Sequence, residues 1–197
     1  MIFAILLIMP QVLFATSNQD KLALAKTICS NFGIKVKQVI CEIDEIQGED
    51  GRLIVQDKVR RAYQILAKPV IVSDDSWNIP VLNGFPGPYM KSINEWFTAE
   101  DFLRLMNGLS DRTIIIDQFL AYYDGQTIKI FHSSLSGKVI DQPRGTNDRS
   151  PSTTITVLDG DHNLTMAEVF NQGRSAIAKL YLTRRGVWHD FIDWYSL

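Results

Sequence analysis

The sequence has few of the residues that define several common protein classes. It contains only two cysteines, Cys29 and Cys41, and no CxxC pair, which argues against a disulfide framework and a structural zinc site. Its 20 basic and 22 acidic residues give a formal net charge of −2, so it offers no basic surface to a nucleic-acid polymer. The three histidines, His132, His162 and His189, are isolated and lack metal-ligand spacing, so we interpret them as ordinary structural residues.

Long hydrophobic runs are also absent. The N-terminal stretch MIFAILLIMP is apolar for only about eight residues, which is too short to cross a bilayer. It also lacks the basic flank and the cleavage site of a signal peptide. Met9 is an alternative start, which would make residues 1–8 an N-terminal extension. We therefore expect a soluble, cytoplasmic protein without membrane contact.

The composition is that of an ordinary globular domain. Of the 197 residues, 46% are hydrophobic and 21% are charged, so the chain is large enough to bury a core. The sequence shows no internal repeat and no disordered linker. We therefore treat residues 1–197 as a single domain.

Alternating strand and helix patterns predict an α/β fold. Hydrophobic spacing predicts helices at residues 21–32, 53–66, 98–109, 176–182 and 187–195. It predicts strands at residues 12–15, 35–40, 70–72, 113–117, 119–123, 127–133 and 153–158, with Asp124-Gly125 as a hairpin turn. We expect a mixed central sheet with flanking helices, in which a strand-rich middle forms a second lobe and two lobes surround a cleft.

The first polar cluster, TSNQDK at residues 16–21, lies between a predicted strand and a predicted helix. The free N–H groups at a helix N-terminus attract phosphate, and Lys21 adds a full positive charge. A simple helix cap with a surface lysine is the alternative, because the glycines of a GxxxxGK[ST] loop are missing.

The second cluster, CEIDEIQGEDG, is acidic. Its five carboxylates are Glu42, Asp44, Glu45, Glu49 and Asp50. Such a run is usually a solvated loop, but one of these side chains would suffice as a ligand for a divalent cation.

The third cluster begins the stretch SDDSWNIPVLNGFPGPYMK at residues 73–91. Asp74 and Asp75 follow the apolar strand 70–72, and two adjacent carboxylates repel unless a cation compensates them. Mg²⁺ can compensate this repulsion, because it binds one or two carboxylates and completes its coordination shell with water and phosphate oxygens. A capped turn is the alternative. Three polar clusters at strand ends favour a shared ligand site, because α/β sheets bind ligands there.

These segments together resemble the inosine triphosphate pyrophosphatase family, whose members hydrolyse non-canonical purine nucleoside triphosphates to monophosphate and pyrophosphate. The resemblance rests on FATSNQDK, EIQGE, the SDDS turn, LNGFPGPYMK, the PRG within residues 142–145, and TMAEV. The motifs follow the family's order from residue 12 to about residue 170.

The resemblance implies a Mg²⁺-dependent enzyme that is a homodimer. Glu45 and Asp75 would bind Mg²⁺, and Asp75 and Lys21 would be catalytic, with Asp75 activating the attacking water. The resemblance further implies a set of residues that bind the nucleoside triphosphate: Thr16, Ser17, Asn18, Lys21, Lys58, Asp75, Ser76 and Lys91.

Two elements that read the base in that family are missing. The segment TNDRSPSTTITV at residues 146–157 stands in place of one that carries an aromatic residue, and the expected Ser-His-Arg falls near residues 176–178, which read Ala-Ile-Ala. A site that loses such donors loses discrimination between substrates. Base specificity is therefore expected to be altered. The alternatives are a nucleotide-binding or interaction protein with little or no activity, and a phosphohydrolase for a smaller ester.

Overall fold

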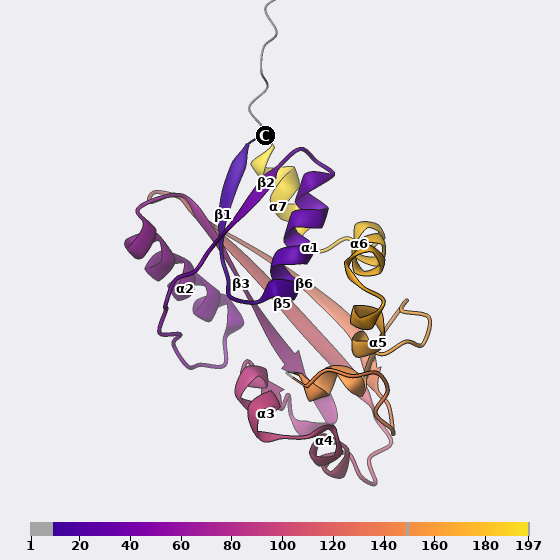
Figure 1. Ribbon diagram of the computed structural model, residues 1–197. Coiled ribbons are helices and arrows are strands. Elements are labelled where there is room, and N and C mark those ends of the chain that lie inside the picture. The colour runs from indigo at the N-terminus through magenta and orange to yellow at the C-terminus, as the bar shows by residue number, and fades with distance from the viewer. Residues whose placement is uncertain (1–9, 149, 197) are drawn as a thin grey trace, which may run out of the picture.

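One long sheet crosses the whole molecule in this computed structural model, which describes residues 10–148 and 150–196; the proposed extension 1–8 lies outside them (Figure 1). The strand order is β2-β1-β3-β5-β6-β7, with β4 also paired to β3. β1 is parallel to β2 and β3, and the other pairs are antiparallel. The strands are β1 Gln11–Ala15, β2 Lys35–Val39, β3 Val70–Asn78, β4 Pro86–Gly87, β5 Thr113–Tyr123, β6 Ile128–Val139 and β7 Thr156–Leu158.

Helices flank this sheet, which confirms the predicted fold class. Figure 1 shows α1, α2 and α7 beside one end of the sheet, and α3 and α4 at the other end. No helix in the described ranges is long and apolar enough to cross a bilayer. The helices are α1 Gln19–Ser30, α2 Gly51–Leu66, α3 Met90–Trp96, α4 Ala99–Leu105, α5 Met166–Asn171, α6 Arg174–Thr183 and α7 Val187–Tyr195, with 3-10 turns at Pro80–Leu82 and Pro151–Thr154.

The two ends of the sheet have separate hydrophobic cores. In the first lobe, α1 and α7 pack on one face of the sheet around Phe14 and Phe191, and α2 packs on the other face around Val59. The second lobe is built around Phe102 and Ile116, beneath α3 and α4. Full burial of each such side chain contributes about 1.5–3 kcal/mol. The first lobe is therefore held by two apolar clusters, one on each face of the sheet, and the second lobe by a cluster of its own.

Between the two cores, β3, β5 and β6 carry mainly polar residues, most of them partly exposed. This central belt consists of residues 73–76, 117–119 and 132–134. The strand register places Asp74 opposite Phe119, which is itself opposite His132. Three long strands thus connect the lobes through a level of mainly polar residues.

The strand boundaries predicted from sequence are wrong at this belt. β3 continues to Asn78, so Asp74 and Asp75 lie inside a strand and not in a turn after it. β5 is unbroken at Gln118, where two strands were expected, and β6 extends to Val139. The hydrophobic pattern stops where the cores stop, whereas the backbone hydrogen bonding continues.

Smaller differences occur in the second lobe. Strand β7 begins only at Thr156, because a 3-10 turn occupies the start of the predicted strand 153–158. Helix α4 ends at Leu105 and not at Leu109, and α3 was not predicted. Capping boxes are present at Thr98, before α4, and at Thr165, before α5.

Candidate active site

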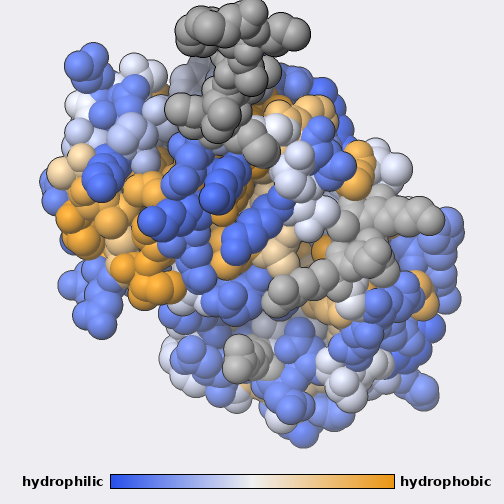
Figure 2. Space-filling model, turned by 45° about the horizontal axis from the view of Figure 1, so that its top comes forward, coloured by the Kyte–Doolittle hydropathy of each residue, from blue (hydrophilic) through white to orange (hydrophobic). Residues whose placement is uncertain are grey.

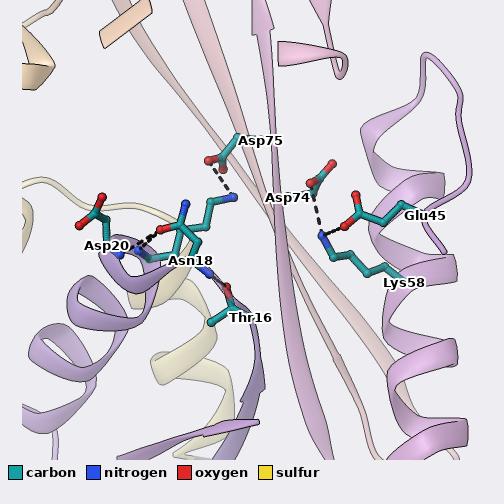
Figure 3. A network of polar contacts seen from close by, with 8 residues as sticks. Thr16, Asn18, Asp20, Glu45, Lys58, Asp74 and Asp75 are labelled. Atoms are coloured by element: carbon teal, nitrogen blue, oxygen red, sulfur yellow. Dashed lines mark hydrogen bonds and ion pairs between the residues drawn. The ribbon is translucent and has the colours of Figure 1, made fainter. Parts of the chain in front are cut away.

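The central part of β3 has an unpaired edge. β1 pairs with β3 only at Val70 and Ile71, and β4 pairs with it only at Trp77 and Asn78. Within the described chain, residues 72–76 therefore face no strand on that side. Successive side chains of a strand point to opposite faces, so Asp74 and Asp75 lie on opposite sides of β3 while both border the open edge (Figure 3).

On one side of β3, Asp75 pairs with Lys21. Lys21 lies in the first turn of α1, and its Nζ is 3.0 Å from Oδ2 of Asp75. Both side chains retain about a quarter of their exposure, at 28% and 26%. The pair is thus reachable from solvent, as a ligand site requires.

The turn before α1 fixes the position of Lys21. The hydroxyl of Thr16 accepts a hydrogen bond from the backbone N–H of Asn18 at 3.1 Å. The Asn18 side chain caps the helix by accepting from the N–H groups of Asp20 and Lys21 at 2.9 and 3.0 Å. These two N–H groups already have a partner, so the charge of Lys21 is the main attraction for a phosphate at this turn. The neighbouring Ser17 is exposed.

On the other side of β3, Lys58 bridges two carboxylates. Its Nζ lies 2.9 Å from Oε1 of Glu45 and 3.6 Å from Oδ1 of Asp74. Lys58 belongs to α2 and is only 15% exposed, whereas Glu45 comes from the loop that precedes α2. Among the carboxylates of the acidic run, Glu45 is the only one that the ion pairs of the described residues connect, through Lys58, to β3.

The charges on the two sides influence one another. Burial opposes the charge on Lys21, but the carboxylates of Asp75, Asp74 and Glu45 outweigh it and raise the pKa of Lys21. Burial raises the pKa of Asp74, against the opposing effect of Lys58 and Lys21. Each of the three carboxylates contacts a lysine, but three carboxylates and two lysines carry a formal net charge of −1, which favours a further cation at this place.

The donor set is compatible with Mg²⁺, which needs only one or two protein carboxylates when phosphate oxygens and water complete its shell. Lys58 contacts both Glu45 and Asp74, so these two carboxylates lie near one another. The sequence led us to expect Glu45 and Asp75 as ligands, and these two contact different lysines. Within the described residues, no group of three or more His, Cys, Asp or Glu side chains has the geometry of a closed metal site.

Two of the expected substrate contacts take no part in these ion pairs. Ser76 is 6% exposed and lies on the Asp74 side of β3. Lys91 is exposed on α3 in the second lobe and forms no ion pair within the described part of the chain.

The sequence interpretation missed Asp117 and His132. His132 was considered isolated, but its Nε2 lies 3.0 Å from Oδ1 of Asp117 on the neighbouring strand. The available signal was the polar pair Asp117-Gln118 within the otherwise apolar run of residues 113–123. The sequence pattern instead predicts a break between two strands at Gln118.

Comparison with known proteins shows the family of the chain. A model described as the Ham1 family matches residues 12–179. The chain belongs to the Ham1 family. This confirms the resemblance found in the sequence, because Ham1 relatives include an inosine triphosphate pyrophosphatase of Schizosaccharomyces pombe, 27% identical over 94% of this chain and 97% of the relative.

Other Ham1 relatives are similar along almost their whole length. A dITP/XTP pyrophosphatase of Methanopyrus kandleri is 30% identical over 94% of this chain and 96% of its own. The solved Ham1 protein of Staphylococcus aureus superposes with a TM-score of 0.73 at 21% identity, covering 94% of this chain and 98% of its own. The structural likeness confirms the fold.

Proposed function

We propose that the protein is a Mg²⁺-dependent nucleoside triphosphate pyrophosphatase that releases a nucleoside monophosphate and pyrophosphate. The observation that carries this proposal is the arrangement of two lysines and three carboxylates around the open edge of β3. Membership of the Ham1 family, with relatives named as pyrophosphatases for dITP, XTP and inosine triphosphate, supports the same reaction.

The two lysines would bind the polyphosphate. In the free protein, Lys21 and Lys58 neutralise carboxylates, and both point toward the edge of β3 from different helices. A triphosphate at this edge competes for them, because it carries more charge than a carboxylate. Lys21 would then move from Asp75 to a phosphate oxygen and leave Asp75 free.

Asp75, once released, would orient the attacking water and accept its proton. A carboxylate in this role typically accelerates a reaction by about 10²–10⁴-fold. Glu45 and a carboxylate of β3 would hold Mg²⁺, which supplies stabilisation of the negative charge on the phosphate oxygens. Thr16, Ser17, Asn18, Ser76 and Lys91 are proposed as supporting substrate contacts; Thr16 and Asn18 also hold the turn that positions Lys21.

The metal and the triphosphate should assist each other's binding. The metal-free cluster carries a formal net charge of −1, which repels a free polyanion. Mg²⁺ reverses the sign of this charge, and the triphosphate draws the lysines away from the carboxylates that the metal needs. Such coupling is reciprocal by thermodynamic necessity.

A substrate panel tests the proposal. Pyrophosphate release is measured with ITP, XTP, dITP and the canonical NTPs, with Mg²⁺ and with EDTA. We expect turnover only with Mg²⁺, and a weaker preference among bases than the family's base-reading motifs would give.

The second candidate, a nucleotide-binding protein without turnover, is motivated by the lack of an aromatic residue in segment 146–157. Binding without pyrophosphate release from any nucleotide would favour that candidate and contradict the enzymatic one.

We also propose that the protein is a homodimer and that it acts in the cytoplasm. The surface is mainly hydrophilic in Figure 2, apart from an apolar area on the side where Figure 1 places α2. Exposed apolar side chains include Leu53 and Ile65 of α2, each 56% exposed, and Ile40, 66% exposed. Light scattering after gel filtration gives the mass in solution: twice the 22.4 kDa of the chain supports the dimer, and a single chain mass contradicts it.

A further inference from the structure

A second polar network lies in the central belt, beyond the ion pairs of the proposed active site. The carboxylate of Asp117 accepts hydrogen bonds from Ser134 at 2.5 Å and from Asn78 at 2.8 Å. Nε2 of His132 lies 3.0 Å from the same carboxylate. The ion pairs of the described chain include no lysine or arginine at Asp117. The partners of this carboxylate are therefore an amide, a hydroxyl and an imidazole.

Two contacts hold the His132 ring in one orientation. The ring stacks on Phe119 with centroids 4.6 Å apart and planes inclined by 21°. Phe119 is itself packed against the start of α2, where a Cβ on Gly51 would lie only 2.5 Å from its ring. With Nε2 directed to Asp117, the other ring nitrogen, Nδ1, has no hydrogen-bond partner among the described residues, and the side chain is 38% exposed.

This oriented imidazole faces the same side of the sheet as Asp74. Asp74 is opposite Phe119 in the register, and Phe119 is opposite His132, so all three project from the same face. Two strand spacings separate His132 from β3, a distance of roughly 10 Å. A ligand whose phosphates lie at Lys58 can therefore reach His132 with its other end.

We propose that His132 is a further substrate-binding residue, positioned by Asp117 and Phe119, which contacts the nucleoside half of the triphosphate. When Nε2–H donates to Asp117, the free Nδ1 accepts a hydrogen bond. It therefore suits a ribose hydroxyl or a base N–H. The neighbouring Asp117 disfavours a phosphate at the same place. This proposal rests on the proposed function and places a contact to the nucleoside on β6, whereas the family's two base-reading elements fall at residues 146–157 and near residues 176–178.

Calorimetric titration of two Mg²⁺-loaded probes tests the proposal. One is α,β-methylene-ITP, which resists hydrolysis at the scissile bond, and the other is inorganic tripolyphosphate, which lacks a nucleoside. His132→Phe keeps a ring to stack on Phe119 but removes both nitrogens. We expect the affinity of this variant for the nucleotide to fall about tenfold, as for one lost hydrogen bond, with tripolyphosphate affinity unchanged. In turnover, KM should rise while kcat stays near wild type.

His162→Asn is the matched control. His162 lies outside the belt at a backbone φ of 52°, a conformation that asparagine tolerates, so both affinities should remain at the wild-type level. Asp117→Asn should lower nucleotide affinity less than His132→Phe does, because the ring loses its orientation but keeps its nitrogens. Equal loss for both probes would place His132 at the phosphates, and unchanged binding of both would remove it from the site; either result overturns the proposal. A wild-type protein that binds neither probe would instead contradict the proposed function itself.

Discussion

The central belt and the two hydrophobic cores use the same strands in opposite ways. In the cores, β3 and β5 bury residues such as Ile71 and Leu120 completely. In the belt, the same strands carry Asp74, Asp75 and Asp117, although burial of a carboxylate opposes folding unless it is paired. The cores hold the two lobes, whereas we propose that the belt serves ligand binding. Changes in the belt should therefore affect activity, and changes in the cores should affect stability.

The largest effect is expected from the belt. Asp75→Asn should reduce turnover of the best substrate by about 10²–10⁴-fold, because the carboxylate that we propose to activate water is lost. The melting temperature should change little, since the side chain is partly exposed. Pyrophosphate release and thermal unfolding are the two measurements. Glu49→Gln, in the exposed acidic loop, is the control and should retain activity; full activity of Asp75→Asn would contradict the assignment.

A core substitution should show the reverse pattern. Phe102→Ala removes a side chain that is 2% exposed in the second lobe and should lower the free energy of unfolding by about 3–5 kcal/mol. Activity per folded molecule should stay near wild type. Urea unfolding gives the stability, with Phe32→Ala as the control, because Phe32 is 51% exposed and its loss should cost less than about 0.5 kcal/mol. Equal costs for the two variants would argue against the second core.

Removing a belt lysine should separate metal binding from phosphate binding. Lys58→Met frees Glu45 and Asp74 from their ion pairs, so Mn²⁺ should bind several-fold more tightly in the absence of nucleotide. Tripolyphosphate should bind more weakly, because one cationic contact is lost. Calorimetry measures both. Weaker binding of Mn²⁺ by the variant would show that Lys58 does not compete with the metal.

The smallest effect concerns the pH dependence of the melting temperature, measured with EDTA present. The raised pKa of Asp74 means that its charged form costs stability, so this cost appears as pH rises through its folded pKa. Asp74→Asn should therefore raise the melting temperature at neutral pH, and the gain should vanish in acid.

Asp101, outside the belt, provides the contrast. Hydrogen bonds from Thr98 lower the pKa of Asp101, so the stability that its charged form contributes to the fold is lost as pH falls. Asp101→Asn should consequently be destabilising at neutral pH; a change of the same sign in both variants would contradict this contrast.

The sequence predicted the lobes better than the belt. Periodic spacing located α1, α2 and α7, because their apolar positions face a core. The strand boundaries that failed worst lie at the belt, where polar residues resemble turns although the backbone continues as a strand. Motif resemblance identified the residues around the β3 edge. It did not reveal that Lys58 joins Glu45 to Asp74, or that His132 meets Asp117, because those contacts depend on strand register and helix placement.

The central claim is that lysines on opposite sides of β3 hold one polyanion at its open edge. Calorimetric titration of Mg²⁺-loaded α,β-methylene-ITP into wild type, Lys21→Ala, Lys58→Ala and the double variant tests it most directly. We predict one binding site per chain in the wild type, weaker binding in each single variant, and a double variant whose loss differs from the sum of the single losses, since both lysines contact the same ligand. Wild-type affinity in either single variant would show that the two sides of β3 serve different purposes and would contradict the account.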